Sequence, residues 1–385
     1  MILKLVIKNL FRHKLRTILT ILGIAVAVVA FSLMRTVISA WYSGANAAAV
    51  NRLVTVHAVS FIYPLPLSYR DQIAKIPGVR EVSFANWFQG TYIDKDQFFA
   101  RFAVDPETFF DLYPECVVSP QEKQAMANQR NGCIIGTKIA KLYNLKIGDV
   151  MNIEGDIYPG QWQMQVVGMY HGRDENSDET WMLFNWHYLD EQLRQSQPGR
   201  AGQVGWYIID ISDPNQRATI SKAVDDLFAN SPAETKTQTE KEFNQGFISM
   251  SSAILTAMNV VSFVIIGIIL LILTNTMAMT ARERLREYAV MKTIGFLPKH
   301  IGTLIAGESL LISSLGALVG LLITLPLAEG IHKTVPPQWF PVFNVEPMTI
   351  VLGVGFALLA GIVAALFPTV RSVQMKIVDG LRYIG

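Results

Sequence analysis

A charged, helix-prone segment from Thr280 to Gly295 separates two long apolar runs, and its side chains are suited to transmitting force to a cytoplasmic partner rather than to catalysis. The segment carries both signs of charge, on Arg282, Glu283, Arg284, Arg286, Glu287 and Lys292. Basic residues beside a membrane-spanning helix are retained in the cytoplasm, and a short amphipathic helix can lie in a groove of a soluble partner. We expect Leu285, Ala289 and Ile294 to form its apolar side and Gly295 to end it. The alternative is that the charges serve only to orient the chain in a membrane.

Glu308 is an ionisable residue inside the next apolar run. It lies roughly 10 Å into that run if the run is helical, where an ionised side chain costs a few kcal/mol unless it finds a partner. We expect a hydrogen-bond donor from a neighbouring helix. The alternative is that the carboxylate reaches back to the cytoplasmic headgroups.

Small residues recur at a spacing of four in the last two apolar runs. Gly316 and Gly320 form one such pair, and Gly353 and Gly361 belong to another series. Small residues at this spacing allow helices to approach closely. We therefore expect these two runs to pack against each other.

The motifs of common enzyme classes are absent from the sequence. There is no G-x-x-x-x-G-K-[ST] loop, no H-E-x-x-H and no G-x-S-x-G, so we predict no catalytic residue, no metal ligand set and no ATP site on this chain. Cys116 and Cys133 are too few for a four-thiolate metal site, and either a disulfide or two free thiols remains open. An acidic loop, 174–179, is expected to be solvated, with cation binding as the alternative.

Four apolar runs are long enough to cross a bilayer, and they would position the charged segment, Glu308 and the small residues. Hydrophobic residues make up 51% of the chain and charged residues 17%, a composition that favours a membrane protein over a soluble enzyme. Each run has the roughly 20 residues that a spanning helix needs. We place the runs at Thr17–Trp41, Ser251–Met279, Ile301–Glu329 and Met348–Val370. The first run exceeds the length of a cleavable signal core, so we expect a retained helix.

Basic clusters predict the orientation of the chain. They occur before the first run, in the connection 280–300, and in the tail 371–385, so all three are expected in the cytoplasm. Residues 1–16 read as a cytoplasmic amphipathic helix. The connections 42–250 and 330–347 must then face outward. The net charge of +2 gives no support for nucleic-acid binding.

The outward connection 42–250 has the length of an independent domain, and its patterns predict an α+β fold. Strands are expected at 52–60, 79–87, 97–104 and 206–211, and helices at 67–76 and 214–230, with Asp213 as an N-cap. A subdomain inserted at about 115–205 is expected to contain a helix and tight turn over 136–149, followed by short strands at 150–153 and 163–169. The predicted fold is thus four transmembrane helices with an extracytoplasmic α+β domain between the first and second.

Three separated blocks resemble the FtsX-like, or MacB-type, permeases of ABC transporters. They are the opening NLFRHKLRTILTILGI at 9–24, the segment TARERLREYAVMKTIG at 280–295 and the closing FPTVRSVQMKIVDGLRY at 367–383. The stretch GTKIAKLYNLKIGD at 136–149 is similar to a recurring piece of the outward domain of MacB-type proteins. Glu308 with Gly316 and Gly320 also fits the third span of the family.

The resemblance implies a permease that passes force between an ATPase and its outward domain in a bacterial inner membrane. A separate ABC ATPase subunit, holding ATP and Mg, would dock at a coupling helix. The contact residues on this chain would be Glu283, Arg284, Arg286, Glu287, Tyr288, Met291, Lys292 and Gly295. A second permease copy, identical or related, is implied. The resemblance leaves open whether a periplasmic adaptor and an outer-membrane duct take part.

The resemblance does not choose the substrate, which could be a lipoprotein, lipid, peptide or drug. An alternative from another class is an FtsX-type scaffold that activates an extracytoplasmic cell-wall hydrolase without moving a substrate. The size of the outward domain favours transport. A membrane-tethered enzyme is disfavoured because no nucleophile and base occur in a recognisable pattern.

Overall fold

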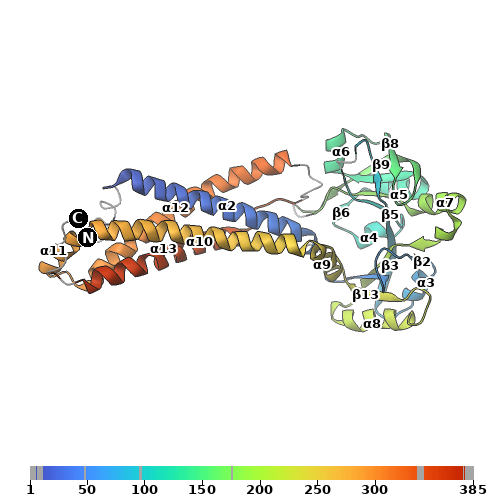
Figure 1. Cartoon of the computed structure of the whole chain (residues 1–385). Coiled ribbons are helices and arrows are strands. Elements are labelled where there is room, and N and C mark those ends of the chain that lie inside the picture. Colours follow the sequence, from blue (N-terminus) through green and yellow to red (C-terminus); the bar gives the residue numbers. More distant parts are fainter. Residues whose placement is uncertain are drawn as a thin grey trace. The chain divides into compact units, whose positions relative to one another are not determined.

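The structure is a computed structural model that describes residues 6, 12–46, 49–94, 98–174, 177–335, 342–375 and 377. The chain divides into two compact units, which we call the helical unit (1–39, 251–334 and 343–385) and the sheet unit (40–250 and 335–342) (Figure 1). The predicted amphipathic helix over 1–16 falls mostly outside the described residues, as does most of the predicted tail.

Within the described residues, four helices are long and apolar enough to cross a membrane. They are α2 Lys14–Asn46, α10 Ser252–Glu283, α12 Pro298–Thr334 and α13 Pro347–Gln374. A short helix, α11 Leu285–Thr293, lies between α10 and α12 along the chain. The helices begin and end within about five residues of the predicted runs. Helices α2 and α12 each continue five residues beyond the predicted ends, to Asn46 and Thr334, and in α12 an i,i+4 ion pair joins Glu329 to Lys333 in this extension.

The helical unit is held together by an apolar core between the long helices. The core residues are Ile24, Ala27, Val28, Ile269, Leu273, Met277, Ile312, Ala317, Ala357, Ala360 and Ala364. The fourth helix of this set, α13, contacts both α10 and α12. Alanines dominate its contribution to the core, and their small side chains allow this close approach.

The sheet unit is built on one long mixed sheet. The strands of the unit are β1 Arg52–His57, β2 Leu65–Pro66, β3 Val79–Trp87, β4 Gly90–Thr91, β5 Arg101–Val104, β6 Cys116–Val117, β7 Gly132–Gly136, β8 Val150–Gly155, β9 Gly160–Gly172, β10 Met182–Asn185, β11 Gln203–Val204, β12 Trp206–Ile211 and β13 Thr235–Thr239. Eleven of these described strands pair in the order β13-β1-β12-β3-β5-β10-β7-β9-β8-β4, with β6 added on β9. Only β5–β10 and β7–β9 are parallel among these pairs.

Helices cover both faces of this sheet. The helices of the unit are α3 Tyr69–Ile73, α4 Phe109–Leu112, α5 Pro120–Asn128, α6 Thr137–Tyr143, α7 Trp186–Ser196, α8 Arg217–Leu227 and α9 Glu240–Met250. One core contains buried residues of α3, α6, α7 and α8, and a second contains those of α4 and α5. Neighbouring strand residues alternate between the two cores, as Ile208 and Ile209 do, because successive side chains of a strand point to opposite faces.

Local signals explain several of the elements. Ser119 and Glu122 form a capping box at the start of α5, and Asn144 adopts a left-handed conformation where α6 ends, so the predicted helix and tight turn over 136–149 are confirmed. The Asp213 side chain accepts a hydrogen bond from the backbone of Asn215, as an N-cap does. Helices α5 and α7 were not predicted, because their sequences are mostly polar.

Two predictions about side chains in the sheet unit can be decided. Cys116 and Cys133 are free, buried thiols, and burial raises the pKa of both.

The acidic loop, 174–179, is less solvated than expected, because Glu179 accepts hydrogen bonds from Thr137 and from the backbone of Gly172. Its carboxylate is therefore engaged in the fold.

Candidate functional site: the elbow between two long helices

The charged segment forms an elbow, defined here as residues 284–297, between α10 and α12. Arg284 ends α10, and α11 follows at once. Gly295 has a φ of +94°, and two hydrogen bonds close the end of α11: Gly295 N to Lys292 O at 3.2 Å and Phe296 N to Met291 O at 3.0 Å. This pair of bonds is a Schellman motif. The predicted end of the helix at Gly295 is confirmed.

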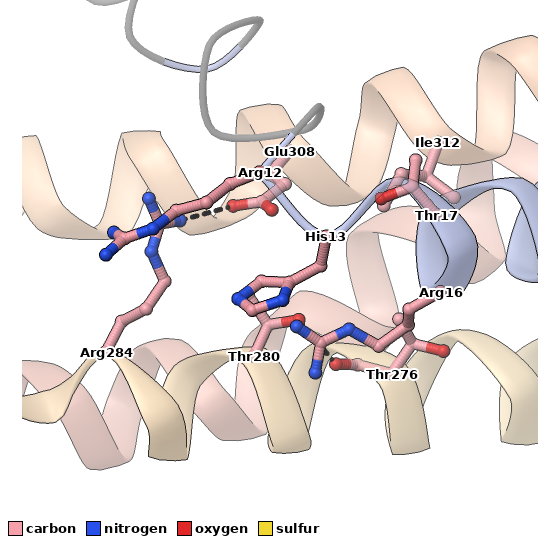
Figure 2. Close-up of a pocket in the computed structure, with 9 residues that line it drawn as sticks. All are labelled: Arg12, His13, Arg16, Thr17, Thr276, Thr280, Arg284, Glu308 and Ile312. Atoms are coloured by element: carbon pink, nitrogen blue, oxygen red, sulfur yellow. Dashed lines mark hydrogen bonds and ion pairs between the residues drawn. The ribbon is translucent and has the colours of Figure 1, made fainter.

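A buried ion pair ties the beginning of the elbow to α12. The Arg284 Nη1 donates to Glu308 Oε2 at 3.0 Å, and the two side chains are only 7% and 9% exposed. Figure 2 shows Arg284 reaching toward Glu308 from the end of α10. Arg284 Nε also donates to Glu287 at 3.3 Å. The expectation that Glu308 finds a donor on a neighbouring element is therefore confirmed.

A second set of hydrogen bonds ties the far end of the elbow to α13. The Lys292 Nζ donates to three backbone carbonyls, those of Ser372 at 3.1 Å, Val373 at 2.8 Å and Met375 at 2.8 Å. These carbonyls lie at the end of α13, where helical carbonyls lack intrahelical partners and a cation is favoured. Partial burial lowers the pKa of Lys292. Its ammonium group caps α13.

An apolar core lies beneath α11. Tyr288 is buried with Ala281, Ile301 and Ile305, and Met291 packs at the edge. Ala289 is also buried. Burial raises the pKa of Tyr288 to about 12. Since Ala289 is fully buried, the prediction that it belongs to a partner-facing stripe is wrong, because the helix needs this face to pack on its own unit.

The surface of the elbow is apolar at other positions. Val290, Ile294 and Leu297 are 45%, 69% and 51% exposed, and Arg286 is exposed beside them. Of the predicted contact residues, Arg284 and Tyr288 are instead internal. They position the elbow rather than present its surface.

The remaining two carboxylates of the segment are paired with residues of the N-terminal region. Glu283 accepts a hydrogen bond from Arg16 at 2.8 Å, and Glu287 forms an ion pair with Arg12. Arg12 and Arg16 also line a small cavity. Its lining residues, drawn in Figure 2, are Arg12, His13, Arg16, Thr17, Thr276, Thr280, Arg284, Glu308 and Ile312. In the part of the chain that the structure describes, no cluster of three or more potential metal ligands occurs.

The glycines of the spacing motifs lie at two different helix contacts. A Cβ added at Gly316 would lie 2.6 Å from Ile24, and one at Gly320 would lie 2.8 Å from Val28, so these two glycines face α2. The prediction that α12 and α13 pack against each other is confirmed, but Gly316 and Gly320 do not make that contact. The packing of α12 on α13 uses Gly361, whose added Cβ would lie 2.5 Å from Ser313 Oγ, and Ser309, which donates to Gly361 O at 2.7 Å.

Gly353 also faces α2. Its added Cβ would lie 3.5 Å from Ser32 Oγ and within 4.0 Å of the Phe31 and Val28 side chains. The small residues of α12 and α13 therefore allow close contact with α2 as well as between α12 and α13. The four-residue spacing of small residues predicts that another helix can approach closely. It does not identify that helix, because any helix can fill the groove.

The sheet unit contains a buried charge cluster that the sequence did not reveal. Arg52, at the start of β1, is 3% exposed and donates from Nε to Glu240 Oε2 at 2.8 Å. It also binds Glu115 and the carbonyl of Leu112. Glu240 accepts a further bond from the backbone of Ala49 at 3.0 Å. The cluster thus joins the segment that follows α2 to the helix that precedes α10. No pattern marks it, because its members are far apart in sequence.

Comparison with known protein families identifies both parts of the chain. The sequence model of the MacB-like periplasmic core domain matches residues 17–227. The model of the FtsX-like permease C-terminal domain matches residues 259–377. The matched ranges include most of α2, most of the sheet unit, most of α10, the elbow, and all of α12 and α13.

Curated relatives agree in kind. The chain is 22% identical to an uncharacterized ABC transporter permease of Methanocaldococcus jannaschii, over 97% of this chain and 96% of the relative. It is 23% identical to the lipoprotein-releasing system transmembrane protein LolC of Haemophilus influenzae, over 65% of this chain and 64% of the relative.

Among solved structures, the periplasmic region of MacB from Actinobacillus actinomycetemcomitans is similar at a TM-score of 0.37 and 9% identity, over 52% of this chain and 94% of that chain. The extracellular domain of the ABC-type transporter YknZ from Gram-positive bacteria is similar at a TM-score of 0.35 and 12% identity, over 49% of this chain and 99% of that chain. The family match over residues 17–227 spans more than half of the chain, and the chain therefore belongs to the FtsX-like ABC transporter permeases that carry a MacB-like periplasmic core domain.

Proposed function

We propose that this permease transmits the motion of a separate ATPase across the bacterial inner membrane to its sheet unit, driving export or extraction of a substrate. Its four long helices would all span the membrane, with the sheet unit on the outer side between the first and second. The elbow would lie in the cytoplasm, where a partner subunit carrying ATP and Mg docks on it. This chain would contribute no catalytic residue.

The observation that carries the proposal is the double attachment of the elbow. Arg284 ties its beginning to α12 through a buried ion pair, and Lys292 ties its far part to the end of α13. The exposed side chains of Val290 and Ile294 are left for a partner. A force applied to this exposed surface would therefore move two long helices together, because protein interiors are closely packed and transmit strain.

The buried charge cluster of the sheet unit supports the same proposal. Arg52 and Glu240 hold together the two segments through which the sheet unit continues into α2 and α10. Breaking such a buried pair is costly, so we expect these two segments to move together within the sheet unit.

Copurification tests the docking surface directly. In Ile294→Asp, a charge replaces an apolar side chain that is 69% exposed at the elbow, so the helical unit should fold normally. We expect recovery of the ATPase subunit with the tagged permease to fall about tenfold, the result of losing roughly 1.4 kcal/mol of binding energy. ATP hydrolysis by the purified complex should fall in parallel.

Ile93→Asp is the matched control, since Ile93 is 77% exposed but lies in the sheet unit. It should leave ATPase recovery unchanged. Normal recovery with Ile294→Asp would contradict docking at the elbow. The other proteins recovered with the wild-type chain decide the remaining alternatives: a second permease, an adaptor and outer-membrane duct, a bound lipoprotein, or the cell-wall hydrolase that an FtsX-type scaffold would activate.

A further inference from the structure

Large apolar side chains are exposed together on one loop of the sheet unit, residues 58–63, which we call the apolar loop. Val59 and Ile62 are each 77% exposed and Tyr63 is 54% exposed. The sequence AVSFIYPLPLSY from 58 to 69 contains no charged residue. Single exposed apolar residues are common on protein surfaces, but a contiguous group of them indicates an interaction site.

Local hydrogen bonds hold the apolar loop in a defined shape. The backbone of Ala58 donates to Glu234 O at 2.8 Å, and that of Tyr63 donates to Ser60 O at 3.1 Å. The backbone of Val59 donates to His57 Nδ1 at 3.2 Å. These bonds keep Val59 and Ile62 on the surface instead of letting them fold back onto the sheet.

The apolar loop packs against the helix that leads into a membrane-spanning segment. The ring of Phe61 lies 4.8 Å from that of Phe247 in α9, and Phe247 is itself 40% exposed. Phe247 precedes Ser252, the first residue of α10, by five residues, which span at most about 18 Å of extended chain. No charged residue occurs from Phe243 to Ala281, so nothing along this path opposes contact with lipid.

We infer that the apolar loop is a membrane anchor, which inserts Val59 and Ile62 at the boundary between headgroups and acyl chains of the outer leaflet. Tyr63 suits the same depth, because tyrosine is enriched at membrane–water interfaces. The absence of charge and the short connection to α10 favour lipid over a protein partner. The anchor would hold the sheet unit at the bilayer surface, and it does not depend on how the elbow functions.

Quenching by brominated lipid tests this inference in the full-length protein. An environment-sensitive fluorophore is attached to Ile62→Cys, and the protein is reconstituted in liposomes with or without acyl-chain-brominated phospholipid. Native Cys116 and Cys133 are 4% and 0% exposed and should not react. We expect brominated lipid to reduce the fluorescence by about half, as for a group buried several ångströms into the interface. A second probe at Tyr63→Cys should respond in the same way.

Ile93→Cys provides the matched control, because Ile93 is also 77% exposed and follows β4. Residue 93 follows a strand that does not pair with β1, the strand that leads into the apolar loop. A probe there should be quenched little. Equal quenching at the two positions would overturn the inference. Shielding of Ile62 from aqueous iodide without quenching by brominated lipid would also overturn it, and would point to a protein partner or a second copy.

Discussion

Arg284 and Glu308 make a buried ion pair at a place where either charge alone would be unfavourable. Both side chains are less than a tenth exposed, and Glu308 lies within a helix that is apolar enough to span a membrane. Removing both charges of a buried pair is often tolerated, whereas removing one leaves the other without compensation. Comparing a single variant of this pair with the double variant therefore separates a role in stability from a role in transmission.

We predict that Glu308→Gln lowers the free energy of unfolding of the helical unit by about 3 kcal/mol, because it leaves the buried Arg284 with only the more exposed Glu287 as a counter-charge. Denaturant titration of the detergent-solubilised protein measures this loss. The double variant Arg284→Met, Glu308→Leu should regain most of the stability. If the pair transmits motion, the double variant should still lose stimulated ATP hydrolysis.

The control for this prediction is an exposed ion pair of the sheet unit. Arg130 and Glu191 are 56% and 47% exposed and 3.2 Å apart, so Glu191→Gln should change the stability by no more than about 1 kcal/mol. If Glu308→Gln were as mild as Glu191→Gln, the pair would not be the structural tie described here.

At the scale of elements, the main finding is that α2 lies in a groove of α12 lined by glycine. Gly316 and Gly320 lie directly under Ile24 and Val28, too close for any added side chain. Ser309 and Gly361 form a separate contact between α12 and α13. The third long helix is thus packed on two sides, and a shift in one contact affects the other.

We predict that Gly320→Ala destabilises the helical unit by about 1–3 kcal/mol, the usual cost of overpacking. The new Cβ would meet Val28 Cβ at 2.8 Å and the Ala25 carbonyl at 2.9 Å, and a backbone carbonyl cannot move aside cheaply. Thermal unfolding in detergent measures the effect. Gly355→Ala in α13 is the control, because no atom lies within 4 Å of its added Cβ. Equal stability of the two variants would show that α2 does not pack so closely.

At the scale of the whole molecule, the proposed function requires the elbow and the sheet unit to lie on opposite sides of the membrane. We expect the basic residues at the elbow to hold it in the cytoplasm. This expectation rests on charge and helix length alone, so it can be tested without knowledge of the substrate.

Single cysteines at Ile294 and Ile93 should report opposite sides. Both positions are well exposed, at 69% and 77%, and the native thiols are buried. A membrane-impermeant maleimide added to right-side-out inner-membrane vesicles should label Ile93→Cys at once, and Ile294→Cys only after the vesicles are opened. Labelling of Ile294→Cys in sealed vesicles would exclude the proposed topology.

The sequence alone determined those features that depend on neighbours along the chain. Hydrophobic length located the four long helices, because a spanning helix must be apolar over about 20 residues. The glycine at 295 predicted the end of α11, because few other residues adopt its dihedral angles. The sequence blocks at 9–24, 280–295 and 367–383 predicted the family that the matching family models then showed.

Only the tertiary structure decided which residues meet across the chain. It paired Arg284 with Glu308, assigned Gly316 and Gly320 to α2, and joined Arg52 to Glu240. It also buried Ala289 of the predicted partner-facing stripe and exposed Val290, while Ile294 of that stripe is exposed. Helical periodicity shows which residues share a face, but not which face is covered, because that choice depends on the shape and chemistry of segments distant in sequence.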